Sequence, residues 1–275
     1  MEPTLDERYQ AAAQEIASAD ALLIGAGAGM GVDSGLPDFR GDEGFWKAYP
    51  PFRGKSFASV SNPAWFLSDP PQAWGFFGHR LHLYRDTVPH EGFAALLRWA
   101  QAKAAGYFVF TSNVDGQFQK AGFPEDRVFE CHGSVHHMQC VKPCSSAIWS
   151  AEGTKVAVSE RTIRATSELP HCPNCNALAR PNVLMFGDWG WIPERSEQQQ
   201  ARYHAWLRDV RGKKLVALEF GAGLAIPTER IECESRPRAL IRVNPREADV
   251  PALGIALPVG ALEAIRNIDR LDIPV

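Results

Sequence analysis

The sequence of 275 residues is 45% hydrophobic and 22% charged, and its formal net charge at pH 7 is −3. This is the composition of an ordinary globular protein with enough apolar residues for a hydrophobic core, which excludes an intrinsically disordered chain. Lysine and arginine are scattered along the sequence and do not form the basic cluster that is typical of proteins that bind nucleic acid or an anionic membrane. Binding to a basic partner is still compatible with the net charge. The length favours one large domain with a smaller module.

The N-terminal segment, residues 1–20, is acidic, and its apolar residues from Leu5 to Ile16 recur at helical spacing. This pattern predicts a helix and is the opposite of a cationic signal peptide. The longest apolar run, residues 21–32, is interrupted by glycines and is too short to span a bilayer. Four cysteines in two close pairs favour metal binding in a reducing compartment. Together these features predict a cytoplasmic protein.

Short apolar runs bounded by glycine or polar residues predict buried strands. They lie at residues 21–24, 107–110, 128–130, 215–220 and 239–243. Apolar residues along one face predict crossover helices at residues 92–105 and 258–268. This alternation predicts an α/β fold with a Rossmann-type parallel sheet and helices on both of its faces.

Two segments interrupt the alternation of strands and helices. Residues 41–90 are rich in proline and aromatic residues, and residues 134–190 contain the paired cysteines. We interpret them as a helical insertion and a zinc-binding module that together form a smaller lobe. The Rossmann-type domain then consists of residues 1–40, 91–133 and 191–275.

A glycine-rich segment, Gly25-Ala-Gly-Ala-Gly-Met-Gly31, follows the first predicted strand. Without side chains, its backbone N–H groups can approach a pyrophosphate at the start of a helix. The dehydrogenase pattern G-x-G-x-x-G fails in every register, because its last glycine falls on Met30, Val32 or Ser34. The triphosphate-binding loop fails as well, because it needs a lysine. Taken alone, the segment equally fits a flexible turn between a strand and a helix.

The glycine segment continues into Ser34-Gly-Leu-Pro-Asp-Phe-Arg-Gly41, and this stretch resembles the sirtuin family, whose hallmark is G-A-G-x-S-x-x-S-G-I-P-D-F-R. Gly31 stands where sirtuins usually have serine. Three more motifs follow in the order and spacing of the family: Thr111-Ser-Asn-Val-Asp115, Glu130-Cys-His-Gly-Ser134 and Arg180-Pro-Asn-Val-Leu-Met-Phe-Gly-Asp188. Weaker similarity at residues 221–224 and 243–244 extends the resemblance over most of the chain.

The resemblance implies an enzyme that consumes NAD and removes acyl groups from lysine side chains of proteins. It makes His132 the base that takes a proton from a ribose hydroxyl, a role that suits imidazole. It assigns Asn113 and Asp115 to the nicotinamide pocket. Without the family context, His132 fits a structural histidine, and the Asn-x-Asp pair fits a turn equally well.

The resemblance also implies which residues bind the cofactor. They are Gly27, Ala28, Gly29, Asp38, Phe39, Arg40, Ser112, Asn113, Val114, Asp115, His132, Gly221, Ala222, Gly223 and Asn244. Ser112 stands where the family has glutamine, so a contact to the ribose is shortened or lost. Ala222 and Gly223 lack the hydroxyls of the family's threonine and serine, which leaves backbone contacts at this turn.

The paired cysteines, Cys140 with Cys144 and Cys172 with Cys175, have the spacing of a structural zinc site. Four thiolates complete a tetrahedral shell and leave no position for a catalytic water, so the zinc is expected to be structural. Reduced core cysteines or a disulfide are the alternative. Two further cysteines and three histidines near the module are interpreted as core and surface residues: Cys131, Cys233, His136, His137 and His171. The H-E-x-x-H pattern of zinc hydrolases is absent from the sequence.

Substrate contacts are implied at two places. Leu184, Phe186 and Gly187 resemble the strand along which sirtuins bind the substrate peptide, although a buried strand without a ligand fits the same apolar run. Phe77 and Arg80 resemble a tyrosine and arginine pair that reads acidic acyl groups, with phenylalanine in place of the tyrosine. The alternative for Arg80 is a solvated residue on a helix.

The leading hypothesis is therefore an NAD-dependent protein-lysine deacylase whose partner is an acyl-lysine protein or peptide. Two alternatives remain. One is a mono-ADP-ribosyltransferase or NAD hydrolase, which the departures at Gly31, Ser112 and Ala222 motivate. The other is an NAD-binding scaffold with low activity. We assume a monomer without nucleic-acid or membrane partners.

Overall fold

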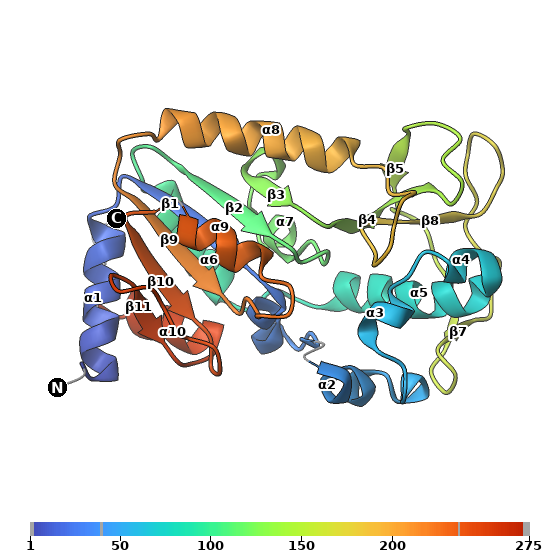
Figure 1. Ribbon diagram of the computed structural model, residues 1–275, viewed down its shortest axis with the longest axis horizontal. Coiled ribbons are helices and arrows are strands. Elements are labelled where there is room, and N and C mark those ends of the chain that lie inside the picture. Colours follow the sequence, from blue (N-terminus) through green and yellow to red (C-terminus); the bar gives the residue numbers. More distant parts are fainter. Residues whose placement is uncertain (1–2, 39–40, 236, 272–275) are drawn as a thin grey trace.

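The computed structural model describes residues 3–38, 41–235 and 237–271, with the side chains of residues 41 and 42 excepted. Figure 1 shows the parallel sheet with its helices on the left and most of residues 41–90 and 134–190 on the right. Within the described residues, no helix combines the length and apolar character needed to cross a bilayer.

The larger sheet has six parallel strands in the order β11-β10-β9-β1-β2-β3. Their bounds are β1 Ala21–Ala26, β2 Tyr107–Thr111, β3 Val128–Glu130, β9 Leu215–Phe220, β10 Ala239–Val243 and β11 Ile255–Leu257. The five strands predicted from the sequence are confirmed, and the edge strand β11 was missed. Because β2 and β9 flank β1 on opposite sides, the strand order reverses there, which is the point where such sheets bind ligands.

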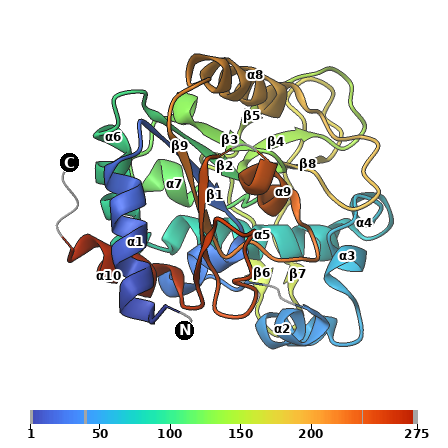
Figure 2. The same ribbon diagram turned by 60° about the vertical axis from the view of Figure 1, so that its left-hand side comes forward.

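Helices cover both faces of this sheet, as predicted. Along β1, side chains alternate between two hydrophobic clusters: Leu22 and Ile24 belong to one, and Ala21 and Leu23 to the other. The first cluster includes α1 (Leu5–Ala17), α6 (Gly92–Gln101) and α10 (Ala261–Asp269), and the second includes α8 (Glu194–Asp209) and α9 (Thr228–Ser235). Figure 2 separates the two helical layers.

The remaining elements lie beside this sheet. The helical segment contains α2 (Gly41–Ala48), η2 (Pro50–Phe52), α3 (Phe57–Val60), α4 (Trp65–Ser68) and α5 (Pro70–Asp86). The cysteine-containing segment forms an antiparallel sheet in the order β5-β4-β8, with β4 Gly133–Cys140, β5 Ile148–Ser150 and β8 Ala179–Val183, and a ribbon of β6 (Val158–Ser159) and β7 (Arg164–Ala165). Three short elements complete the described fold: η1 (Ala28–Ser34), α7 (Gln117–Lys120) and η3 (Glu125–Arg127).

Helix α5 joins these two segments through buried hydrogen bonds. The Trp74 indole N–H donates to the Ala179 carbonyl over 2.9 Å, and the Gln72 side chain donates to the Ile163 carbonyl over 2.8 Å. At Gly75, an added Cβ would lie 2.0 Å from the same Ile163 carbonyl, so the helix and the β6–β7 ribbon touch backbone to backbone. One aromatic-rich hydrophobic cluster spans both segments.

Candidate active site

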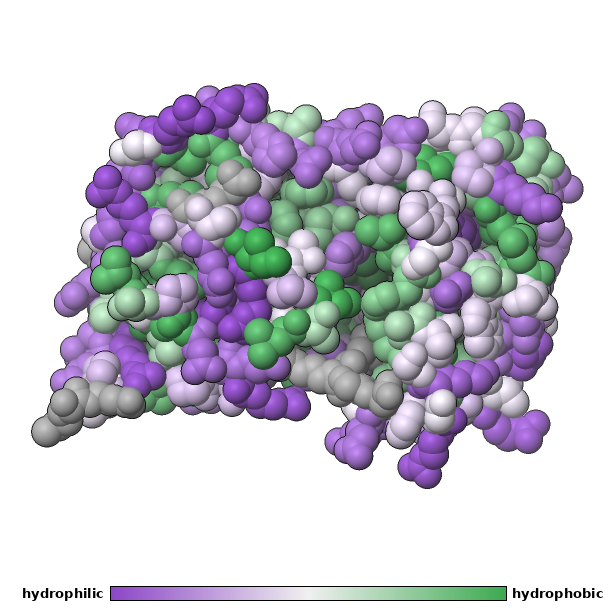
Figure 3. All heavy atoms as spheres, in the orientation of Figure 1, coloured by the Kyte–Doolittle hydropathy of each residue, from purple (hydrophilic) through white to green (hydrophobic). Residues whose placement is uncertain are grey.

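A cleft of about 610 Å³ opens where β1, β2 and β9 end. One wall consists of the turns that follow these three strands. The opposite wall comes from α3, α5 and the residues after β8. Figure 3 shows that this face of the molecule is hollowed between its left and right parts.

Two glycine turns meet backbone to backbone at this cleft. The Gly27 N–H donates to the Phe220 carbonyl over 2.9 Å, and the Gly29 N–H donates to the Gly221 carbonyl over 3.1 Å. A Cβ on Gly27 would lie 2.8 Å from the Gly221 oxygen. At Gly221, where φ is +61°, a Cβ would lie 2.3 Å from the Gly29 Cα. Glycine at these positions therefore lets the two turns pack together at the edge of the sheet where a dinucleotide pyrophosphate could bind.

Asn113 and Asp115 follow β2 and line the cleft together. The Asn113 side chain donates to the Gly27 carbonyl over 2.9 Å, which ties it to the glycine turn. Asp115 is buried, and its Oδ1 accepts the Gln117 N–H over 2.9 Å. Burial raises the pKa of Asp115 to about 6, so this carboxyl is close to its titration point at neutral pH.

His132 lies between β3 and β4 and also lines the cleft. Burial lowers the pKa of its imidazole, while a hydrogen bond with the Ser112 backbone acts in the opposite direction. The net shift is downward, so the ring is neutral at neutral pH. A neutral imidazole can accept a proton, as a general base must.

Arg80 on α5 is buried in the cleft wall and is only 5% exposed. Its Nε donates to the Tyr84 hydroxyl over 2.9 Å, and its guanidinium carbon lies 5.3 to 5.6 Å from the ring centroids of Phe76, Phe77 and Tyr84. The alternative of a solvated helix residue is therefore wrong. Phe77 packs beside Arg80 and does not line the cleft itself.

The segment after β8 forms another part of the cleft wall. The Leu184 N–H donates to the His132 carbonyl over 2.9 Å, and the Phe186 N–H donates to the Ser61 carbonyl over 3.0 Å. Both side chains are more than one third exposed, so this run is not a fully buried strand. Gly187, with φ of +67°, follows the cleft-lining part.

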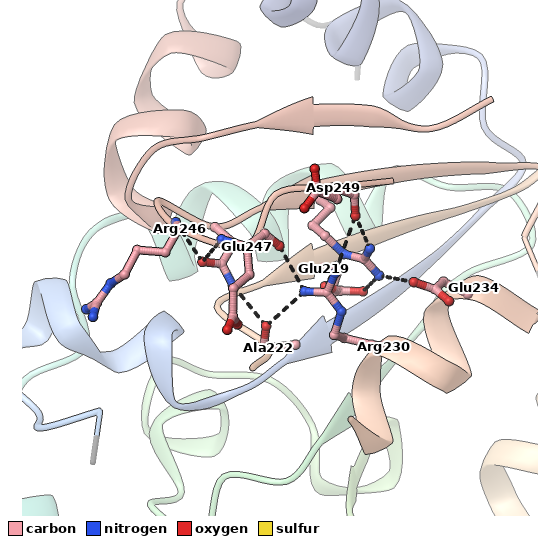
Figure 4. A network of polar contacts seen from close by, with 9 residues as sticks. Glu219, Ala222, Arg230, Glu234, Arg246, Glu247 and Asp249 are labelled. Carbon is pink, nitrogen blue, oxygen red and sulfur yellow. Dashed lines mark hydrogen bonds and ion pairs between the residues drawn. The ribbon is translucent and has the colours of Figure 1, made fainter. Parts of the chain in front are cut away.

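Buried polar side chains form hydrogen bonds with the turn after β9 (Figure 4). Asn244 is fully buried, donates from Nδ2 to the Ala222 carbonyl over 2.9 Å, and accepts the N–H groups of Arg246 and Glu247 over 3.1 Å each. Arg230 on α9 donates to the same Ala222 carbonyl and to the Glu247 carbonyl. These contacts hold the turn in place and leave Gly221 and Gly223 at the cleft surface.

The four paired cysteines come together at one end of the antiparallel sheet. The Sγ atoms of Cys140 and Cys175 are 3.7 Å apart, as are those of Cys144 and Cys172, and all four lie within 4.8 Å of one another. Disulfide sulfurs would be about 2.05 Å apart. A tetrahedral zinc with Zn–S bonds of about 2.3 Å spaces its sulfurs by about 3.8 Å, so the cluster fits zinc.

The other cysteines and histidines lie outside this cluster. Cys233 is a fully buried core residue, as predicted, and Cys131 is half-buried. His136 and His137 are half-buried and line a second pocket at the surface. The His136 Nε2 forms a 2.8 Å hydrogen bond with the Asp115 carbonyl. Of these three histidines, His171 is the exposed one.

Most of the residues that the sequence assigned to the cofactor or substrate line one cleft. They are Gly27, Ala28, Asp38, Arg80, Ser112, Asn113, Val114, Asp115, His132, Leu184, Phe186, Gly221 and Gly223. Five others lie behind or beside its surface: Gly29, Phe77, Gly187, Ala222 and Asn244. Phe39 and Arg40 fall outside the described residues.

Sequence reasoning missed several polar residues of the cleft, among them Tyr84 and Glu229. Tyr84 lies one helical turn after Arg80, and this spacing was the available signal for it. Glu229 belongs to α9, and no local pattern marks it. Its carboxylate accepts the Ser112 N–H over 2.7 Å, although the two residues are 117 positions apart in the sequence.

Comparisons with known proteins agree with this geometry. Residues 27–203 match the model of the Sir2 family. An "NAD-dependent protein deacetylase" of Saccharolobus solfataricus is 31% identical over 182 residues, which is 66% of each chain. An "NAD-dependent protein deacylase 1" of Archaeoglobus fulgidus is 30% identical over 237 residues, which is 84% of each chain. The matches span 66%, 65% and 63% of the first three relatives' lengths, just under two thirds.

A solved structure of a Sir2 homologue in complex with NAD is similar in fold, with a TM-score of 0.69. It shares 22% sequence identity with this chain, and the match covers 95% of this chain and 94% of that one. The family model, the Archaeoglobus relative and the arrangement of the cleft together show that the chain belongs to the Sir2 family.

Proposed function

We propose that this protein is an NAD-dependent protein-lysine deacylase, which moves an acyl group from a lysine side chain to the ADP-ribose part of NAD. The proposal rests above all on one observation, that His132, Asn113 and Asp115 line the same cleft as two glycine turns. The deacylase and deacetylase names of the relatives support it.

NAD would lie across the carboxyl edge of the sheet. The N–H groups of Gly27, Gly29 and Gly221 donate within the fold. Neighbouring backbone N–H groups of the two turns, such as those of Ala28 and Gly223, would hold the phosphates. Asn113 and Asp115 would hold the nicotinamide end. NAD supplies a labile glycosidic bond, whose cleavage releases nicotinamide.

His132 acts as the general base. Its neutral ring accepts a proton from a ribose hydroxyl, which makes that oxygen a better nucleophile toward the acyl group, and later returns the proton. Burial of the cleft wall excludes water, which would otherwise compete with the hydroxyl.

The acylated lysine enters beside Leu184 and Phe186. An extended peptide can pair with this segment through backbone hydrogen bonds, which makes affinity tolerant of sequence. Gly187 ends the segment. Arg80 is placed to contact the acyl group, and Phe77 acts through Arg80 by packing against it.

We also propose the division into a Rossmann-type domain of residues 1–40, 91–133 and 191–275 and a small lobe of residues 41–90 and 134–190. The separate hydrophobic clusters support this division. A zinc bound by four thiolates stabilises the small lobe and requires reduced cysteines, which supports a cytoplasmic location. The monomeric state and the lack of nucleic-acid partners stay predictions.

The test is the replacement of His132 by alanine. We expect deacylation of acyl-lysine peptides to fall by roughly 100-fold or more, because a general base contributes about that much. Zinc content and the melting temperature should stay at the wild-type values. Mass spectrometry of NAD and peptide products measures the reaction, and His204→Ala, an exposed position on α8, is the control. Unaltered turnover in His132→Ala removes this residue from the mechanism.

A second candidate function is favoured by Ser112 and Gly31, which lack the side chains usual in the family. Weaker positioning of the ribose would favour NAD hydrolysis or ADP-ribosyl transfer over deacylation. The same product analysis separates the outcomes: deacylation yields O-acyl-ADP-ribose, hydrolysis yields free ADP-ribose, and transfer labels a protein. A scaffold would bind NAD without releasing nicotinamide.

A further inference from the structure

A buried carboxylate, that of Glu229, lies in the cleft wall and has no part in the mechanism above. The residue is the second of α9 and is only 1% exposed. It nevertheless lines the cleft next to Ser112 and His132. Carboxylates are rarely buried without a partner, because their desolvation costs several kcal/mol.

The hydrogen bonds to the Glu229 carboxylate come from Ser112 and from the backbone of Glu229 itself. Oε1 accepts the Ser112 N–H over 2.7 Å. The Ser112 side chain and the Glu229 N–H also donate to this carboxylate, and among the described residues no lysine or arginine forms an ion pair with it. The charged groups that act on it include another acid, Glu219, which disfavours a second negative charge. Because a carboxylate can accept about four hydrogen bonds, an oxygen of Glu229 at the cleft wall can still accept one from a ligand.

Ser112 shows which part of the ligand this oxygen faces. Its N–H donates to Glu229, and its backbone is hydrogen-bonded to His132, so the two side chains converge on one residue. His132 is the base for a hydroxyl of the ribose that bears nicotinamide. Since the Ser112 side chain is short, Glu229 completes the wall beside the same sugar.

We propose that the Glu229 carboxylate accepts a hydrogen bond from a hydroxyl of the nicotinamide-bearing ribose. Hydroxyls suit this oxygen because they donate without bringing further negative charge into an acidic surrounding. A charge-assisted bond of this kind holds the sugar in register with His132. The inference rests on the proposed use of NAD and adds a ribose-binding residue to it.

The experiment compares two ligands that differ in this sugar. ADP-ribose contains the second ribose, and ADP lacks it. In Glu229→Gln the amide oxygen can still accept the Ser112 N–H, so the fold is kept while the carboxylate charge is lost. We expect the affinity for ADP-ribose, measured by titration calorimetry, to fall roughly tenfold or more and that for ADP to stay unchanged. Glu232→Gln is the control, because this carboxylate on the same helix accepts from the Tyr203 hydroxyl.

Other outcomes overturn the proposal. Unchanged ADP-ribose affinity in Glu229→Gln leaves this carboxylate as an anchor for Ser112 alone. An equal loss for ADP and ADP-ribose places the effect in the adenosine half of the cleft or in the shape of the turn. Should the wild-type protein bind neither ligand, the NAD site itself is wrong. If the predicted affinity pattern appears while the wild type removes no acyl group, the deacylase function fails and the role of Glu229 stands.

Discussion

Burial disfavours the ionised form of the Asp115 carboxyl. Burial raises the pKa of this carboxyl from 3.8 to about 6. Between these two values the folded chain holds one proton more than the unfolded chain, so the free energy of unfolding falls as pH rises through this window. Above pH 6 the ionised carboxylate costs on the order of 2 to 3 kcal/mol of stability. A group kept at this cost in a cleft is typical of a functional site.

Replacing Asp115 by asparagine removes this cost and keeps an oxygen that can accept the Gln117 N–H. We expect the unfolding free energy of the variant relative to that of the wild type to rise by on the order of 2 kcal/mol from pH 4 to pH 7.5. Denaturant unfolding of both proteins at the two pH values measures the difference. Asp209→Asn, at the exposed end of α8, corrects for the loss of one charge. A difference independent of pH contradicts the raised pKa.

Arg80 shows what a single residue's sequence context leaves open. The neighbouring residues fit a solvated helix position as well as a buried one. Packing decided between them, because α5 is enclosed by the cysteine-containing segment and only 5% of Arg80 remains exposed.

At the scale of elements, the contact between the turns after β1 and β9 shapes the cofactor side of the cleft. Parallel pairing of β1 with β9 brings Gly27 and Gly29 against Gly221. Neither turn can acquire a side chain at the contact without moving the other. The pairing thus brings the two glycine turns together at the place where the phosphates of NAD would bind.

Gly221→Ala tests this contact. The alanine must adopt a positive φ and place its Cβ 2.3 Å from the Gly29 Cα, so we expect a loss of about 2 kcal/mol or more in unfolding free energy. ADP-ribose binding should weaken as well. Gly223→Ala is the matched control, because a Cβ there meets only the end of the Glu247 side chain at 3.8 Å. Equal behaviour of the two variants argues against the close approach.

At the scale of the whole molecule, the cysteine cluster does not line the cleft, but it is connected to the hydrophobic cluster of the small lobe, because Cys140 pairs with Ala179 of β8. Ala179 belongs to that hydrophobic cluster, and its carbonyl accepts the Trp74 N–H of α5. The zinc site is therefore coupled to the helix that carries Arg80.

Removal of zinc by a chelator should lower the melting temperature by roughly 10 °C or more, because a structural zinc contributes several kcal/mol to folding. Added zinc should restore it. Cys172→Ala should abolish zinc binding, measured by atomic absorption, whereas Cys131→Ala should keep it. Full stability after complete removal of zinc contradicts the structural role.

Much of the framework could be predicted from the sequence, because it depends on local patterns. Apolar runs gave five of the six parallel strands, and cysteine spacing gave the four-thiol cluster. Strand β11 was missed because three residues are too few for a pattern. The strands of the small lobe were missed because β4 includes the polar residues His136, His137 and Gln139, and because β5, β6 and β7 have only two or three residues each.

The sequence by itself determined the turn glycines, the strands and the thiol ligands of this protein, since each is recognised from neighbouring residues. Only the tertiary structure decided which side chains share the cleft. Glu229 meets Ser112, and Arg80 becomes buried, through packing between segments many residues apart. Such contacts depend on how strands and helices are arranged in space, which no local pattern encodes.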